Sequence, residues 1–288
     1  MFKKILVATD LSEISEQIIN AIPSLRSIGT EEIVLVHCLN IRDVGGLANT
    51  LSPLIQPVLN KQQTQLTEQG FNTRTEIRIG IPAIEINRAA QEKDCSLIVV
   101  GSHGYNLTKD ILLGGVTTAV LHTATRPVLV IKIEPDEAKG SKPSPWNPLH
   151  HILYPTDFSD NAEAAFLYLE EIVAAGAAKV TLLHIQDHIF GVHVKDRLEV
   201  FNRIDRERLI QLAERLQAKN NKTEIVIDVI YGSVAGEVIK LIKEQPVSMV
   251  VIGAQGRGHI GEMFLGSVSN KVVRYSPVPV ILVPLVHS

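Results

Sequence analysis

The sequence predicts an α/β protein in which two doubly wound, five-stranded parallel sheets follow each other along the chain. Three observations lead to this fold class. The chain of 288 residues repeats itself once, a proline-rich segment separates the two copies, and short apolar runs alternate with helical patterns inside each copy. The length alone also favours about two domains.

The repeat is carried by three pairs of similar segments. ILVATD at 5–10 returns as ILYPTD at 152–157, and both are apolar runs that end in an aspartate. The other two pairs are IVLVHC at 33–38 with VTLLHI at 180–185, and RPVLVIK at 126–132 with VPVILVP at 278–284. We therefore expect a first domain at 1–134, a linker at 135–149 that holds four of the 14 prolines, and a second domain at 150–288.

Each element of the first copy has its own local signal. The apolar run at the start predicts a buried parallel strand, and Ser12 can cap the helix after it. Gly70 ends the second helix, alternation marks the third strand as nearer the sheet edge, and Pro82 begins the third helix. The predicted strands are 3–8, 33–38, 74–79, 96–100 and 128–131. The predicted helices are 13–28, about 53–70, 82–93 and 116–124.

Right-handed crossovers between these strands give the order 3-2-1-4-5, with a switch point between strands 1 and 4. Ligands of doubly wound sheets bind beyond the carboxyl ends of the strands at such a point. In the first copy these ends are Ala8, Thr9 and Asp10 on one strand and Val100 and Gly101 on the other. The matching residues of the second copy are Pro155, Thr156, Asp157, Ile252 and Gly253.

A spaced glycine pattern follows strand 4 in both copies. In the second copy Gly253 and Gly256 are separated by two residues, and nine more lead to Gly266, followed by Ser267, Val268 and Ser269. Glycines let the backbone approach a ligand, and the free amides of a helix start suit a phosphate, to which the two serines can add hydroxyl donors. The alternative is that the glycines only shape a loop and the serines only cap a helix.

With these motifs in view, both halves resemble the universal stress protein family, in particular its ATP-binding branch with a Rossmann-like, HUP-type fold. The resemblance covers all of the chain except the linker. It implies an adenine-nucleotide-binding stress-response protein with ATP or a related adenine nucleotide as the ligand, and any Mg or Mn would be carried by the phosphates. In the second copy it implies contacts from Pro155, Thr156, Asp157, Ile185, Ile252, Gly253, Gly256, Gly266, Ser267, Val268 and Ser269. Asp157 would lie near the ribose and Ile185 would line the adenine pocket.

The first copy departs from the family pattern. Gly115 stands where the family has Ser or Thr, and Ala8 stands where the second copy has Pro155. Losing one hydroxyl bond to a charged group weakens binding by roughly one to two decades, so we expect a weaker first site. Its candidate residues are Ala8, Thr9, Asp10, Cys38, Val100, Gly101, His103, Gly104, Gly114, Gly115, Val116 and Thr117.

Other polar residues leave alternatives open. His37 and His184 end equivalent strands; a structural hydrogen-bonded role is favoured over a metal or catalytic pair. Cys38 has no neighbouring general base that a third residue would orient, so it is interpreted as a residue that lines the pocket. His103 is either a phosphate neighbour or a solvated loop histidine, and Lys109 and Arg257 are either phosphate contacts or ordinary loop cations.

Composition and missing motifs narrow the function. A net charge of -3 argues against a nucleic-acid partner, two cysteines argue against a disulfide or zinc framework, and no apolar run is long enough for a membrane span, so a cytoplasmic location is expected. No P-loop lysine motif or nucleophile elbow occurs, so we expect regulation or signalling with at most slow ATP hydrolysis. A slow ATPase or adenylyl-transfer enzyme, and an assembly module with a vestigial first site, remain alternatives.

The last strand of each copy, 128–131 and 280–283, is an apolar sheet edge that needs a partner. The family pairs these edges between subunits. We therefore expect self-association through the last strands, as a pseudo-twofold pair within the chain that can dimerise again.

Overall fold

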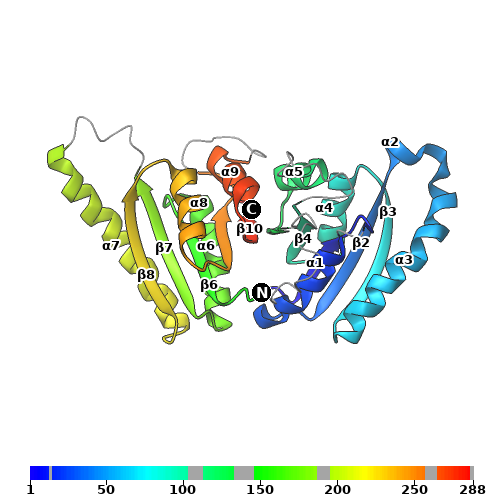
Figure 1. Ribbon diagram of the computed structural model, residues 1–288, viewed down its shortest axis with the longest axis horizontal. Coiled ribbons are helices and arrows are strands. Elements are labelled where there is room, and N and C mark those ends of the chain that lie inside the picture. Colours follow the sequence, from blue (N-terminus) through cyan, green and yellow to red (C-terminus); the bar gives the residue numbers. More distant parts are fainter. Residues whose placement is uncertain (13–14, 103–112, 133–145, 187–194, 257–264, 286–288) are drawn as a thin grey trace. The chain divides into compact units, whose positions relative to one another are not determined.

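The computed structural model describes residues 1–12, 15–102, 113–132, 146–186, 195–256 and 265–285 (Figure 1). The chain divides into two compact units, Met1–Trp146 and Asn147–His287. Most of the predicted linker, together with the loop residues His103, Gly104, Lys109 and Arg257, lies outside the described residues. The domain bounds given above therefore stay predictions.

The described residues of unit 1 form five strands that match the predicted ones in number and position. They are β1 Lys4–Ala8, β2 Glu32–Asn40, β3 Asn72–Gly80, β4 Leu97–Gly101 and β5 Val128–Ile131. The helices between them are α1 Ser15–Ala21, a 3-10 helix Ile22–Ile28, α2 Ile41–Val44, a 3-10 turn Gly45–Leu47, α3 Ala48–Glu68, α4 Pro82–Glu92 and α5 Gly115–Thr123.

Unit 2 repeats this plan with fewer short helices among its described residues. Its strands are β6 His151–Pro155, β7 Lys179–Gln186, β8 Glu224–Tyr231, β9 Met249–Gly253 and β10 Val280–Val283. Its helices are α6 Asp160–Ala174, α7 Lys195–Lys219, α8 Val234–Glu244 and α9 Ser267–Tyr275.

The strand order confirms the predicted fold class. It is β3-β2-β1-β4-β5 in unit 1 and β8-β7-β6-β9-β10 in unit 2, and the registered pairs within each unit are parallel. In unit 1, α1 packs against α3 and α4 packs against α5, so each face of the sheet carries a pair of helices (Figure 1). In unit 2 the pairs are α6 with α7 and α8 with α9. Strands such as β4, β5, β9 and β10 are apolar and buried, as in other parallel sheets. The edge strands β3 and β8 are mostly half-buried, which fits the alternating pattern that marked the third strand as an edge strand.

The first predicted helix, 13–28, is split in the structure. The α-helix ends at Ala21, and a 3-10 helix with Pro23 in its first turn continues to Ile28. Proline has no amide hydrogen and its ring clashes with the carbonyl four residues earlier, so the α-helical ladder stops there. Ser12 does act at the start, because its Oγ accepts a hydrogen bond of 3.2 Å from the amide of Ser15.

The second predicted helix begins earlier than expected. α3 starts at Ala48 instead of about 53, and it contains Pro53 and Pro57. Proline is best tolerated in the first turn of a helix, whereas Pro53 and Pro57 lie beyond the first turn of α3. The short α2 and the 3-10 turn that follows it were not predicted. The side chain of Asn40 caps α2 by accepting a hydrogen bond of 3.2 Å from the amide of Arg42.

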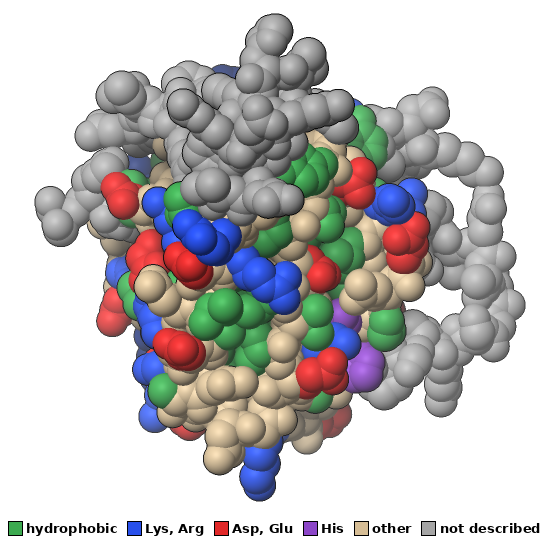
Figure 2. Space-filling view, turned by 90° about the vertical axis from the view of Figure 1, so that its left-hand side faces the viewer, with side chains coloured by type: hydrophobic (Ala, Val, Ile, Leu, Met, Phe, Trp, Pro, Cys, Tyr) green, Lys and Arg blue, Asp and Glu red, His purple; other side chains and the backbone are tan. Residues whose placement is uncertain are grey.

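The face of unit 2 that carries β8 and α7 has charges of both signs. Figure 2 shows Lys and Arg side chains interspersed with Asp and Glu on this side of the molecule. Unit 2 contains ion pairs such as Lys179 with Glu224 and Arg203 with Glu207.

None of the described helices is both long enough and apolar enough to cross a membrane.

His151 at the start of β6 is expected to make unit 2 acid-sensitive. Its side chain is buried, Nε2 lies 2.8 Å from Oγ1 of Thr181, and Nδ1 has no hydrogen-bond partner among the described residues. Burial, assisted by the nearby Lys179 and His150, lowers the pKa of His151 from 6.5 to about 4. Between these two values the unfolded chain takes up a proton that the folded chain does not. The free energy of unfolding should therefore fall by roughly 3 kcal/mol as the pH drops from 6.5 to about 4.

Urea denaturation at several pH values measures this effect. The matched control is His151→Gln, which keeps a side-chain hydrogen-bonding group for Thr181 but cannot titrate. The stability of the wild type relative to this variant should decrease with acidity. An equal pH dependence of both proteins would show that His151 is not responsible.

Candidate functional site

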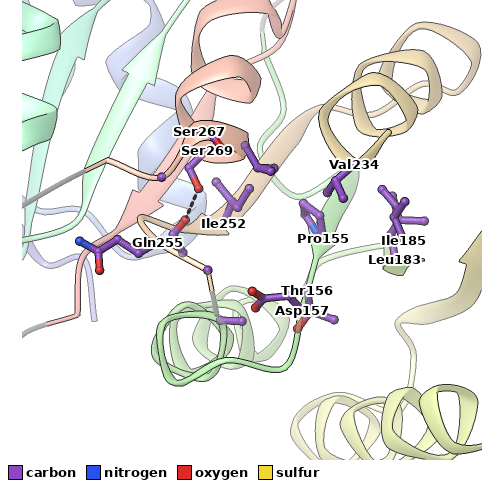
Figure 3. A pocket seen from close by; sticks show the side chains of 15 residues that line it. Pro155, Thr156, Asp157, Leu183, Ile185, Val234, Ile252, Gln255, Ser267 and Ser269 are labelled. Atoms are coloured by element: carbon purple, nitrogen blue, oxygen red, sulfur yellow. Dashed lines mark hydrogen bonds between the residues drawn. The ribbon is translucent and has the colours of Figure 1, made fainter. Parts of the chain in front are cut away.

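A pocket of about 360 Å³ opens at the carboxyl ends of β6 and β9 in unit 2 (Figure 3). This volume is within the range of small-molecule sites. All eleven residues predicted for the second copy line it: Pro155, Thr156, Asp157, Ile185, Ile252, Gly253, Gly256, Gly266, Ser267, Val268 and Ser269. Their convergence follows from the strand order, because β6 and β9 are neighbours and their ends meet at the switch point.

One side of the pocket is apolar. In Figure 3 the side chains of Pro155, Ile185, Val234 and Ile252 gather on this side, and Leu183 lies beside Ile185. They come from the ends of β6, β7 and β9 and from the first residue of α8. Such a surface suits the flat face of a ring system. The sequence reasoning missed Leu183 and Val234; Leu183 lies two residues before Ile185 on the same face of β7 and could have been found from that spacing.

The other side of the pocket is the start of α9. Gly266 is the N-cap, no side chain in the described part of the chain caps this helix end, and the next three residues line the pocket. The first amides of a helix have no acceptor within the helix, and the helix dipole adds partial positive charge there. This end of the pocket can therefore accept an anionic group such as a phosphate.

The hydroxyl of Ser269 has a different role from the one expected. Ser269 Oγ donates a hydrogen bond of 2.7 Å to the carbonyl of Gly253, drawn as a dashed line in Figure 3. Thr117 makes the same bond of 2.7 Å to Gly101 in unit 1. These hydroxyl hydrogens tie the helix start to the end of the neighbouring strand, so they are not available to a phosphate. Ser267, two residues earlier, is the other serine of the helix start that lines the pocket.

The glycines of the motif allow close approaches that a side chain would block. A Cβ at Gly253 would lie 2.7 Å from the backbone oxygen of Asn161 at the start of α6. A Cβ at Gly256 would lie 2.7 Å from Oδ2 of Asp157. The loop after strand 4 is closed in the same way in both units, by Gly266 N to Ala254 O at 2.8 Å and by Gly114 N to Ser102 O at 2.7 Å.

The loop that carries Asp157 is held in an unusual backbone conformation. Phe158 has a φ of 60°, and its counterpart Leu11 in unit 1 has a φ of 61°. In unit 2 the amide of Ser159 donates to Oδ1 of Asp157 at 3.0 Å. In unit 1 Oδ1 of Asp10 accepts from both the amide and the hydroxyl of Ser12, at 3.1 and 2.7 Å. These bonds fix one carboxylate oxygen and aim the carboxyl group.

Unit 1 places those of its candidate residues that the structure describes on the corresponding elements. Thr9 and Thr117 are buried, whereas Asp10 and Val116 are exposed and Ala8 is half-buried. Gly115 is the first residue of α5, and a Cβ added there would meet nothing within 4 Å. Burial and the nearby Glu85 raise the pKa of the Cys38 thiol to about 12, so this thiol stays protonated and is no nucleophile at neutral pH.

The family model that matches this sequence is described as the universal stress protein family, and it matches twice, at residues 1–132 and 148–284. The chain belongs to the universal stress protein family.

Three relatives show how far the similarity extends. A universal stress protein of Methanocaldococcus jannaschii is 31% identical over 156 residues, which is 46% of this chain and 96% of that protein. One from Mycolicibacterium smegmatis is 26% identical over 223 residues, 74% of this chain and 69% of that protein. The crystal structure of a universal stress protein from Archaeoglobus fulgidus has a TM-score of 0.76 and 24% identity, and covers 99% of both chains, which shows the common fold of the whole tandem chain.

The strand-end histidines of this universal stress protein make equivalent contacts in its two units. His37 Nδ1 lies 2.9 Å from the carbonyl oxygen of Thr9, and His184 Nδ1 lies 2.8 Å from that of Thr156. Both imidazoles therefore hold the backbone just before the loop aspartate, which is the structural role favoured from the sequence. Among the described residues no group of three or more His, Cys, Asp and Glu side chains is placed to hold a metal ion.

Proposed function

We propose that unit 2 binds an adenine nucleotide, with ATP as the expected ligand, and that this occupancy serves regulation or signalling in a stress response. The observation that carries the proposal is the division of one 360 Å³ pocket into an apolar wall, a carboxylate and an uncapped helix start. A nucleotide has three parts in the same order, namely a flat base, a ribose with hydroxyl donors and an anionic phosphate chain.

Each part has a candidate partner. The base would pack on Ile185 and Val234, the ribose hydroxyls would donate to the carboxylate of Asp157, and the phosphates would accept from the amides at the start of α9 and from the hydroxyl of Ser267. Because Gly256 has no side chain, the space next to Asp157 Oδ2 stays open for a ligand. A Cβ at this position would fill it. A divalent Mg or Mn would be held mainly by the phosphate oxygens, since such ions favour oxygen ligands.

Unit 1 is proposed to be a second, weaker site for the same ligand. Its helix start carries Gly115 in place of Ser267, so one hydroxyl donor is missing. Self-association through β5 and β10 and a location in the cytoplasm are proposed on the sequence argument alone.

Isothermal titration with ATP should rank the two sites after mass spectrometry has identified the small molecule released from freshly purified, denatured protein. Ser267→Ala should weaken the tighter site by roughly ten- to a hundredfold, because it removes a hydrogen bond to a charged group. Gly115→Ser should tighten the weaker site by a similar factor, since nothing lies within 4 Å of the added Cβ. A protein that retains no nucleotide and gives no heat with ATP would refute the proposed function.

A further inference from the structure

The wall that encloses the pocket of unit 2 is built from smaller side chains in unit 1. The two units share a strand register, because Ala8 pairs with Val36 as Pro155 pairs with Leu183. Residues at equivalent positions can therefore be compared one by one. Unit 1 has the smaller side chain at a series of pocket positions: Ala8 for Pro155, Val36 for Leu183, Cys38 for Ile185, Val100 for Ile252 and Gly115 for Ser267.

The other described wall positions do not offset this loss of volume. Ser15 stands where Ala162 lines the pocket of unit 2, but its side chain is buried and its hydroxyl donates to the carbonyl of Ser12 at 2.7 Å. The extra methyl group of Thr117 is also buried. The remaining two positions hold similar or identical side chains, Pro82 for Val234 and Val116 for Val268.

The space beside Cys38 has not been closed by its neighbours. Cys38 and Ala8 are half-buried, whereas Pro155 is buried and Ile185 is only 7% exposed. A protein interior is close-packed, so a smaller side chain around which the wall had closed would be no more exposed than a larger one. The wall of unit 1 is therefore more open at the end of β2 than that of unit 2 is at the end of β7.

The larger neighbour of Cys38 on β3 is held away from this space. Arg78 pairs with Cys38 in the strand register, where unit 2 pairs Ile230 with Ile185. The guanidinium of Arg78 forms ion pairs with Glu85 and Glu92, and both of these carboxylates belong to α4. Arg78 is therefore engaged with the helix that covers this face of the sheet, and the opening at Cys38 remains.

The edge of the wall at the start of α4 is apolar in unit 1 only. Ile81 is the N-cap of α4, directly before Pro82, and Ile81 and Ile84 are 41% and 47% exposed. Unit 2 has Ser233 and Gly236 at these positions, and a Cβ at Gly236 would lie 3.4 Å from Cβ of Ser233, so the two positions are adjacent. An apolar ligand group at this edge would remove the two isoleucine side chains from water, which favours binding.

We propose that the two units differ in ligand, and that unit 1 accepts an adenine nucleotide whose base carries an apolar substituent that unit 2 excludes. The inference rests on the proposed function, because it names the ligand class of the first site. The ribose is attached to the five-membered ring of adenine, so with the ribose at Asp10 the six-membered ring extends farther along the wall. Cys38 is the specificity-determining residue there, because its counterpart Ile185 would pack on the base in unit 2.

Isothermal titration of the full chain with ATP and two analogues tests this difference. One analogue carries a benzyl group on the exocyclic amine of the base, and the other carries a methylthio group on the carbon between the two nitrogens of the six-membered ring. An Asp157→Asn background reports on unit 1, and an Asp10→Asn background reports on unit 2. For at least one analogue, the affinity relative to ATP should be about tenfold or more higher in unit 1, the usual size of discrimination in an apolar pocket. Equal ratios in the two units for both analogues would overturn the proposal.

Exchanging the two wall residues tests the role of Cys38. Cys38→Ile should remove the preference of unit 1 for the analogue, and Ile185→Cys should let unit 2 accept it. Cys38→Ala is the matched control, since it removes the thiol but keeps the side chain small, and it should keep the preference. Thermal unfolding without ligand checks that each variant is folded. If neither exchange changes the ratio of affinities, Cys38 does not determine specificity.

The same titrations separate this inference from the proposed function. If ATP binds and the two units treat both analogues alike, the proposed function stands and the difference between the units is refuted. If neither unit binds ATP, the proposed function itself fails.

Discussion

Asp157→Asn is expected to weaken ATP binding to unit 2 by about one to two orders of magnitude. Hydrogen bonds to a charged group contribute about 1.5–3 kcal/mol each, and the amide replaces one acceptor oxygen by a donor. The fold should tolerate the change, because an asparagine keeps the Oδ1 that accepts from the amide of Ser159. Isothermal titration gives the affinity, and thermal unfolding without ligand checks that stability is retained.

The matched control is Asp10→Asn in unit 1. Asp10 occupies the equivalent loop position, and its Oδ1 also accepts a hydrogen bond from the amide of the loop serine, here Ser12. This variant should leave the tighter ATP site unchanged. Equal losses from the two variants would show that the two units contribute alike, and an unchanged affinity in Asp157→Asn would remove the proposed ribose contact.

Gly253→Ala is expected to lower the free energy of unfolding of unit 2 by about 1–3 kcal/mol, the usual cost of overpacking a buried site. The added Cβ would lie 2.7 Å from the carbonyl oxygen of Asn161 and 2.8 Å from its carbon. Both atoms belong to the backbone at the start of α6, so relief requires the helix to move away from β9. The pocket would widen with it, and ATP affinity should fall as well.

Hydrogen exchange followed by mass spectrometry measures the loss of stability in unit 2, because its peptides report on unit 2 separately from unit 1. Faster exchange is expected in β6 and β9 of the variant. Gly115→Ala serves as control, since a Cβ at that helix start meets nothing within 4 Å. Unchanged exchange in β9 would mean that the contact between Gly253 and α6 relaxes without cost.

The sequence predicted the sheet order because it follows from local signals that occur twice, and the same signals placed the strand ends and spaced glycines of the second copy together. The remaining second-copy pocket residues, such as Ile185, were implied by the resemblance to the family. Apolar runs locate the strands, crossover handedness fixes their order, and the order brings the strand ends together. What it could not predict depends on tertiary contacts. Pro53 and Pro57 lie inside α3, and the hydroxyl of Ser269 is directed to Gly253. The contact between His184 and Asp205 joins residues whose separation in sequence carries no periodic signal.

The left-handed backbone at Leu11 and Phe158 has a consequence for how this loop can change. Neither side chain favours such a φ, and each costs about 1–2 kcal/mol that the surrounding unit must supply. Leu and Phe differ in shape but have the same positive φ at this position. The surrounding structure of each unit, and not the residue type, therefore imposes this backbone conformation. The loop therefore stores backbone strain. If the hydrogen bonds that hold it were broken, the residues after the first strand of each unit would relax to a less strained conformation.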